Sequence, residues 1–377
     1  MSTSRVRVRP SSSGSDDVFA GVLSKGGVAT HVCGRAWLLA LLEFEAALAR
    51  AQAHVGVITA EQANEIQAVC ELDRFDVESI GADAAEIGNP AGAVVKALKA
   101  MTDAPVHHGA TSQDAVDTAA MLVTKRALGP LRHDLHAAAD AAAQLAETHR
   151  DTPIMGRTLL QAARPTTFGL KAAGWMLGLD EAADDIGRVP LSVQLGGPVG
   201  TLADVGGTEV VRRVARDLGL DAPVIPWHTR RGHVGELAGA LGVAAGATGK
   251  PARDITLLAQ TEVAEVREGR GGGSTSMPHK HNPVAAVSAL GCAQQAPGYV
   301  ATLLAAMVQE HERAAGAWHS EWRPLTNLLI SVGSAAAWLR ESLEGLQVDA
   351  ERMRANLGDD TDVGAAPELV DKALEHR

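Results

Sequence analysis

Residues 325–346 read Leu-Thr-Asn-Leu-Leu-Ile-Ser-Val-Gly-Ser-Ala-Ala-Ala-Trp-Leu-Arg-Glu-Ser-Leu-Glu-Gly-Leu, and this stretch decides the fold class. Its apolar side chains recur every three or four residues, which is the period of one helix face. The stripe consists of Leu325, Leu328, Leu329, Val332, Ala335, Ala336, Leu339, Leu343 and Leu346. Pro324 precedes the stripe and suits the first turn of a helix. The segment is therefore predicted to be a long helix that buries one face.

Four more segments have helical patterns, so five long helices are predicted. They cover residues 111–150, 165–188, 232–268 and 282–307. Pro251 lies inside the third segment and indicates either a kink or two separate helices. Pro297 indicates a kink in the fourth.

These segments divide the chain into four predicted parts. Residues 1–17 are rich in Ser and Arg and are expected to be disordered. Residues 18–105 form an N-terminal domain of shorter helices, such as residues 36–54. Residues 106–348 form a central five-helix bundle, and residues 349–377 form a short C-terminal remnant domain. The predicted fold class is all-α.

Composition supports this class and restricts the partners. The chain is 46% hydrophobic but only 3% aromatic, and strand cores prefer aromatic and β-branched residues. A formal net charge of −11 argues against nucleic acid as a partner. An anionic substrate must therefore be attracted by local groups.

The sequence shows no pattern typical of a signal peptide, a membrane-spanning helix or a cysteine metal site. No window approaches 18 consecutive apolar residues, and the N-terminus lacks the apolar core of a signal peptide. Three cysteines, at positions 33, 70 and 292, have neither metal-binding nor disulfide spacing. We expect a cytoplasmic enzyme without metal or cofactor.

The richest motif is Gly-Ser-Thr-Ser-Met-Pro-His-Lys-His-Asn-Pro at residues 273–283. Glycines before it permit unusual backbone angles and leave N–H groups free to face an anion. Its hydroxyls and the cation of Lys280 suit a loop that closes over a negatively charged substrate. A Gly/Ser linker followed by a Pro-rich turn is the alternative interpretation of the composition.

A second motif, Val-His-His-Gly-Ala-Thr-Ser-Gln-Asp, covers residues 106–114 and precedes a long predicted helix. Thr111 and Ser112 can cap that helix, and its free N–H groups can bind a carboxylate. An ordinary helix cap is the alternative. His107 and His108 are adjacent and lack an acidic cluster, so metal binding is not expected.

Both motifs resemble the fumarase/aspartase superfamily. Residues 273–283 resemble its G-S-S-x-M-P-x-K-x-N signature, with Thr275 at the second serine, and residues 107–114 resemble its H-x-G-x-T-S-x-D region. The region at 156–169 resembles the second conserved region, but Leu159 stands where the fumarate-releasing lyases have a histidine. The amide of Gln161 remains and can bind a carboxylate. Leu159 and Leu160 could alternatively face the core.

Finer features resemble the bacterial 3-carboxy-cis,cis-muconate cycloisomerases. These are residues 310–322, residues 107–114 and Trp227-His-Thr229. The family's Arg-Asp-Arg after Trp-His appears here as Arg231-Gly232-His233. The family closes a tricarboxylate to 4-carboxymuconolactone in protocatechuate degradation, and the resemblance implies a homotetramer with active sites shared between chains.

The resemblance also implies the roles of site residues. Ser274 would be the proton donor and Lys280 would act with it in catalysis. The substrate-binding residues would be His107, Thr111, Ser112, Gln161, Thr275, Met277 and Asn282. A carboxylate leaving group has a pKa of roughly 4 and needs no proton, which is consistent with a leucine at position 159.

Two other functions remain open from the sequence. One is another superfamily lyase that performs β-elimination on a succinate-type substrate, such as a nitrosuccinate or adenylosuccinate lyase. The other is a non-catalytic helical scaffold, which retention of Ser274, Lys280, Asn282 and Thr111 disfavours.

Overall fold

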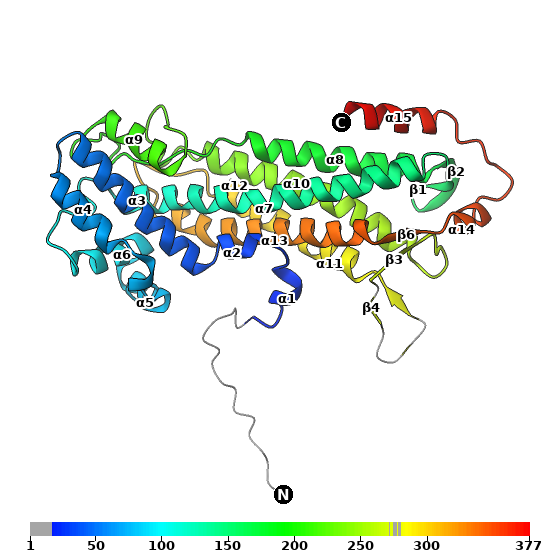
Figure 1. The fold of residues 1–377 in the computed structure, drawn as a ribbon, viewed down its shortest axis with the longest axis horizontal. Helices are drawn as coiled ribbons and strands as arrows, with labels where there is room; N and C mark the ends of the chain where they lie inside the picture. Colours follow the sequence, from blue (N-terminus) through cyan, green and yellow to red (C-terminus); the bar gives the residue numbers. More distant parts are fainter. Residues whose placement is uncertain (1–16, 271, 274–276, 278–279) are drawn as a thin grey trace, which may run out of the picture.

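Long helices dominate the structure. The computed structural model describes residues 17–270, 272–273, 277 and 280–377, so the predicted disordered segment lies outside it apart from Asp17. Helices α7 (Ser112–Thr148), α8 (Phe168–Arg188), α10 (Gly232–Leu258) and α13 (Ala317–Glu344) run along one elongated bundle (Figure 1). The shorter α11 (Val284–Ala293) and α12 (Ala296–Ala305) follow one another against α10 and α13. The all-α prediction is confirmed.

Short helices precede α7 in the chain or follow α8. They are α1 (Ala20–Leu23), α2 (Val28–His31), α3 (Gly34–His54), α4 (Ala60–Val69), the 3₁₀ helix η1 (Leu72–Arg74), α5 (Val77–Ile87), α6 (Pro90–Lys99) and α9 (Thr208–Leu218). Most of them gather around the start of α7, whereas α1 and α2 lie against the middle of the bundle (Figure 1). The longest of them, α3, packs against α4, α7 and α9. The apolar side chains Leu38, Leu41, Leu42, Phe44 and Leu48 of α3 are buried.

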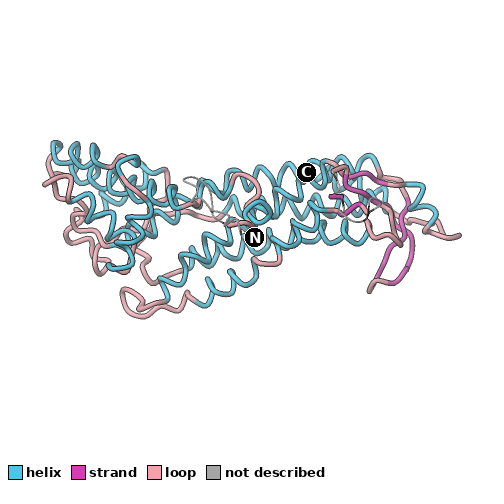
Figure 2. The backbone as a smooth tube through the Cα atoms, turned by 90° about the horizontal axis from the view of Figure 1, so that it is seen from below, coloured by secondary structure: helices cyan, strands magenta, loops and turns pink. Residues whose placement is uncertain are grey.

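The opposite end of the bundle carries the strands (Figure 2). An antiparallel hairpin joins β1 (Pro153–Thr158) to β2 (Gln161–Thr167). Strand β3 (Val266–Glu268) pairs with β6 (Leu346–Val348), and β4 (Gly272–Gly273) pairs with β5 (His281–Asn282). After α14 (Ala350–Ala355) the chain returns, and α15 (Ala366–His376) packs on α8 and α7.

Proline positions explain several differences from the predicted helices. Pro251 lies inside the single helix α10, so the two-helix alternative is wrong. Pro324 also lies inside a helix, because α13 begins earlier, at Ala317, where Trp318 and Glu321 are buried. The segment at 282–307 is two helices, and Pro297 stands in the first turn of the second. A proline there costs little because the first N–H groups of a helix have no partner within it.

Two predicted helices are shorter than expected because short strands take their ends. The helix predicted to end at 268 ends at Leu258, and residues 266–268 form β3. The helix predicted from 165 begins at Phe168, because the preceding residues pair in the hairpin. Within the described residues, no helix has the length and apolar character that a membrane span needs.

A close approach between the end of α7 and the start of α8 depends on a glycine. A Cβ at Gly169 would lie 2.7 Å from the carbonyl oxygens of Ala146 and His149 and from the Cα of Arg150. These are backbone atoms, so they cannot move aside as a flexible side chain can. Gly174, one and a half turns later on the same helix, has no atom within 4 Å of the Cβ position.

We predict opposite effects for alanine at these two positions. Gly169→Ala should lower the free energy of unfolding by about 1–3 kcal/mol, because the backbones of the two helices must separate. Gly174→Ala should raise it by about 0.5–1 kcal/mol, because alanine costs less backbone entropy in a helix than glycine. Urea denaturation followed by circular dichroism measures both. Equal midpoints for the two variants would contradict the close approach.

Candidate active site

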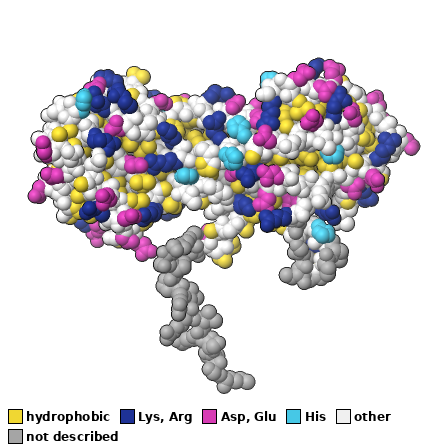
Figure 3. All heavy atoms as spheres, viewed as in Figure 1, with side chains coloured by type: hydrophobic (Ala, Val, Ile, Leu, Met, Phe, Trp, Pro, Cys, Tyr) yellow, Lys and Arg dark blue, Asp and Glu magenta, His cyan; other side chains and the backbone are white. Residues whose placement is uncertain are grey.

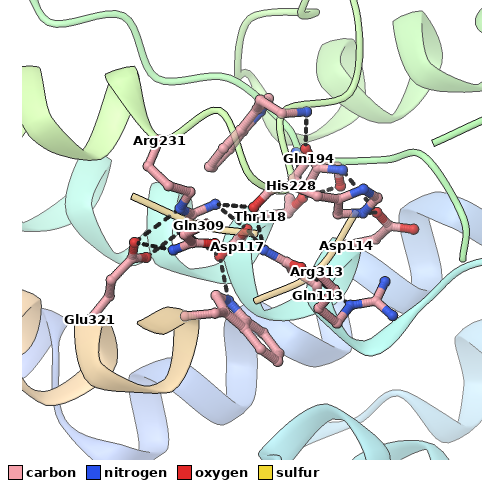
Figure 4. Close-up of polar contacts among 12 residues, drawn as sticks. Gln113, Asp114, Asp117, Thr118, Gln194, His228, Arg231, Gln309, Arg313 and Glu321 are labelled. Carbon is pink, nitrogen blue, oxygen red and sulfur yellow. Dashed lines mark hydrogen bonds and ion pairs between the residues drawn. The ribbon is translucent and has the colours of Figure 1, made fainter. Parts of the chain in front are cut away.

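One carboxylate organises the start of α7. Oδ1 of Asp114 accepts hydrogen bonds from Gln194 Nε2 at 3.0 Å, the Gly196 N–H at 3.0 Å and His228 Nε2 at 2.7 Å. Oδ2 accepts from the N–H groups of Thr111 and Gly197 at 3.0 and 2.9 Å. Five donors satisfy both oxygens of this fully buried carboxylate. Asp114 therefore holds the helix start, the loop at 194–197 and the segment at 228 together (Figure 4).

A buried ionic network lies one turn further along α7. Arg231 donates to both oxygens of Asp117, at 2.6 and 3.1 Å, and to both oxygens of Glu321 on α13. Trp318 Nε1 donates to Asp117 at 3.0 Å, and Gln309 Nε2 donates to Glu321 at 3.0 Å. These charges are almost fully buried but paired and hydrogen-bonded, which is the condition under which burial is tolerated.

The pKa values of this network follow from burial and pairing. Burial acts to lower the pKa of Arg231, but Asp117 and Glu321 outweigh it and raise that pKa above its usual range. Burial raises the pKa of Glu321, and Arg231 opposes this only in part. The guanidinium is therefore a fixed positive charge that ties α7, α10 and α13 together.

The network reaches the surface through Gln113 and Arg313. Gln113 Nε2 donates to Asp117 at 3.1 Å and to the His228 carbonyl at 2.7 Å. Its Oε1 accepts from Arg313 Nε at 3.3 Å, and Arg313 also donates to the Pro198 carbonyl. A nearby pocket of about 460 Å³ is lined by Val199, Gly200, Ile225, Pro226, His228, Thr229, Arg230, His311 and Glu312.

His107 lies at the same end of the molecule as Thr111 and Ser112. Its Nδ1 is 2.6 Å from Oε1 of the buried Glu45 on α3. Burial alone would lower the pKa of His107, but the charge and hydrogen bond of Glu45 dominate and raise it. Its backbone is left-handed, with φ of 62°, and the next glycine approaches the backbone of Asp204 closely. Thr111 and Ser112 are half-buried at the start of α7.

The other predicted site residues lie at the far end of the bundle. Gln161 is exposed at the start of β2, directly after the hairpin tip formed by Leu159 and Leu160. These two leucines are 96% and 75% exposed with φ of 50° and 64°, so the alternative that they face the core is wrong. The tip of the β1–β2 hairpin therefore places both leucine side chains in solvent, outside the bundle.

The segment around β5 completes this second group. Met277 and Lys280 are exposed, and Asn282 is half-buried. Asn282 lines a pocket of about 640 Å³ together with Glu268, His281, Pro283 and residues of β6. Ser274 and Thr275 lie outside the described residues.

Within one chain the two groups of predicted residues do not meet. Helix α7 has 37 residues, so at 1.5 Å per residue it separates them by roughly 55 Å. His107, Thr111 and Ser112 stand at its start, and Gln161 follows its far end (Figure 1). In the described part of the chain, no three His, Cys, Asp or Glu side chains are grouped to hold a metal ion.

Sequence reasoning did not assign roles to Asp114, Asp117, Arg231, Glu321 or Arg313. All five lie in or beside the motif regions. The only sequence signal for them was the pair Asp114 and Asp117, which are three residues apart and so face the same side of a predicted helix. In the Arg231-Gly232-His233 stretch, the arginine that matches the family is fully paired. His233 packs edge-on against Trp227, and burial lowers its pKa.

Comparison with known proteins identifies relatives along most of the chain. A family model described as "Lyase" matches residues 28–298. A 3-carboxy-cis,cis-muconate cycloisomerase of Bradyrhizobium diazoefficiens is 46% identical over 90% of this chain and 79% of its own length. A nitrosuccinate lyase of Streptomyces davaonensis is 43% identical over 88% of this chain and 74% of its own length.

A solved structure agrees with these sequence relatives. The 3-carboxy-cis,cis-muconate lactonizing enzyme from Pseudomonas putida superposes with a TM-score of 0.84 and 38% identity, covering 95% of this chain and 87% of the other. The chain therefore belongs to the lyase family, within the fumarase/aspartase superfamily that its motifs resemble.

Proposed function

We propose that this protein is a cycloisomerase that converts 3-carboxy-cis,cis-muconate to 4-carboxymuconolactone. The observation that carries the proposal is its 46% identity to a cycloisomerase of that name over 90% of the chain. Similar enzymes of Pseudomonas aeruginosa and Pseudomonas putida are 45% and 43% identical. Loss of ultraviolet absorbance when purified protein is mixed with 3-carboxymuconate tests it directly.

The reaction needs charge stabilisation more than leaving-group protonation. An internal carboxylate adds to an alkene carbon, and negative charge accumulates on the carboxylate of the adjacent carbon. Lys280, Asn282 and Thr275, with the N–H groups at the start of α7, are suited to stabilise that charge. Ser274 would deliver the proton to the α-carbon, and Met277 would contact the substrate.

A second candidate is elimination of nitrite from nitrosuccinate. The 43% identity to the Streptomyces enzyme favours it, and a good leaving group likewise requires no histidine at position 159. Release of nitrite from nitrosuccinate, compared with turnover of 3-carboxymuconate, distinguishes the two activities.

The site requires more than one chain under this proposal. Thr111 and Gln161 are roughly 55 Å apart along α7, yet both would bind one small tricarboxylate. Antiparallel neighbours in a homotetramer would bring opposite bundle ends together. Exposed apolar side chains on the bundle, Val243 of α10, Val287 of α11 and Leu304 of α12, are 55%, 53% and 46% exposed and suit such packing. Apolar side chains also show between charged ones along the bundle in Figure 3.

Replacing Ser274 by alanine should lower turnover of 3-carboxymuconate by about a hundredfold or more, the scale of a general acid or base. The change removes only a hydroxyl, so circular dichroism and oligomer size should match the wild type. Near-normal turnover in a folded variant would exclude the role of Ser274.

Restoring a histidine at position 159 should not accelerate lactonisation, because no leaving group needs a proton. Leu159 is 96% exposed in the single chain, so the substitution leaves the bundle intact. Steady-state kinetics of the Leu159→His variant, compared with those of the wild type, measure the turnover of 3-carboxymuconate. A clear rise in turnover would show that the protonation argument is wrong.

Mixing two inactive variants tests whether sites are shared. Thr111→Ala and Ser274→Ala, dissociated and reassembled together, should regain part of the activity, because some sites then receive only intact residues. Each variant reassembled alone is the control. Mixed oligomers without recovered activity would show that each chain carries a complete site.

A further inference from the structure

The buried carboxylate of Glu268 connects three elements next to the 273–283 motif. Glu268 ends β3 and is 5% exposed. Its Oε2 accepts from the Ala285 N–H at 3.0 Å, and its Oε1 accepts from the Ala286 N–H at 2.8 Å. The Ser342 hydroxyl of α13 donates to the same Oε1. The carboxylate thus holds the first turn of α11 against α13.

Helix α11 depends on this distant carboxylate because its own sequence lacks a cap. The residue before the helix is Pro283, which makes no side-chain capping bond. The first N–H groups of a helix need acceptors from outside it. Glu268, 17 residues earlier, supplies them, and its negative charge also interacts favourably with the helix dipole.

The first turn of α11 is directly continuous with Asn282. Asn282 pairs with Gly272 in the β4–β5 ladder, and Pro283 joins it to the helix. Glu268 and Asn282 line the same 640 Å³ pocket. Glu268 is itself fixed, because β3 pairs with β6 and the Gly269 N–H donates to the Gly345 carbonyl at 2.8 Å. A shift of the helix start would therefore shift Asn282 relative to a rigid strand.

We propose that Glu268 is a positioning residue for the reaction: by capping α11 it fixes where Asn282 presents its amide. The inference rests on the proposed function, in which Asn282 contacts the substrate. It has a second consequence for binding. Because an internal carboxylate already occupies the start of α11, that helix end does not bind a substrate carboxylate, and Lys280 and Asn282 serve that role.

A double-mutant cycle between Glu268→Gln and Asn282→Ala tests the coupling through kcat/KM. Glutamine keeps the size of the side chain but replaces one acceptor oxygen by an NH₂ group, which cannot accept from an N–H of α11. Glu268→Gln should lower kcat/KM for 3-carboxymuconate by about tenfold or more, equivalent to about 1.4 kcal/mol. The double variant should be no worse than the more damaged single variant, because both changes remove the same interaction. Effects that multiply would overturn the proposal.

Glu265→Gln provides a matched structural control. Glu265 is fully buried three residues earlier, but it pairs with Arg157 and Asn356 and not with α11. Its substitution disturbs the same region through a different contact. Any effect it has should multiply with that of Asn282→Ala. Equal coupling of both glutamates to Asn282 would reduce the role of Glu268 to general stability and overturn the proposal.

Hydrogen–deuterium exchange gives a readout that does not depend on activity. In Glu268→Gln, a peptide covering residues 284–293 should exchange about tenfold faster or more, whereas peptides from α7 should be unchanged. An unchanged exchange rate of the α11 peptide in a folded variant would overturn the proposal that Glu268 caps α11. A wild-type protein that fails to turn over 3-carboxymuconate would contradict the proposed function alone, and the exchange experiment would still decide whether Glu268 holds α11.

Discussion

The length of α7 constrains everything else in this molecule. A continuous helix of 37 residues is stiff, so motif residues at its two ends have fixed and distant positions. Short helices cover one end and short strands cover the other (Figures 1 and 2). Each end carries one group of the motif residues, and under the proposed function both groups contribute to one site. The proposed antiparallel assembly would use this stiffness, because a rigid helix holds each group of motif residues in a fixed place.

Both ends use the same physical device to hold their motif. At one end Asp114 accepts N–H groups from a helix start and from the loop at Gly196. At the other end Glu268 accepts N–H groups from the start of α11. In each case a buried carboxylate is satisfied by donors from distant segments, so removing it would leave several N–H groups without acceptors. These two buried carboxylates thus hold in place neighbouring segments that have few apolar side chains of their own.

The sequence predicted the features that depend on local pattern. Helical periodicity located the buried stripe of α13, and Thr111 marked the start of α7. Strands of two to seven residues were missed because Gly and polar residues give no periodic signal over so short a length. The Arg231 network was missed because its partners are 114 and 90 residues away. The motifs at 106–114 and 273–283 indicated a candidate site region, but only the fold shows which carboxylates hold these segments in place.

Leu159 links the fold to the chemistry. It stands at the tip of the β1–β2 hairpin, almost fully exposed and with a left-handed backbone, and Gln161 follows two residues later. A large apolar side chain in this position gains nothing in the single chain, because it packs against no core. In a shared site the same hairpin would bring the Gln161 amide to the substrate and place an apolar wall where related lyases have a proton-transferring histidine. Excluding water there strengthens the attraction between a developing carboxylate charge and Lys280. The leucine is thus consistent with a reaction limited by charge stabilisation, in which a proton donor for the leaving group would have no task.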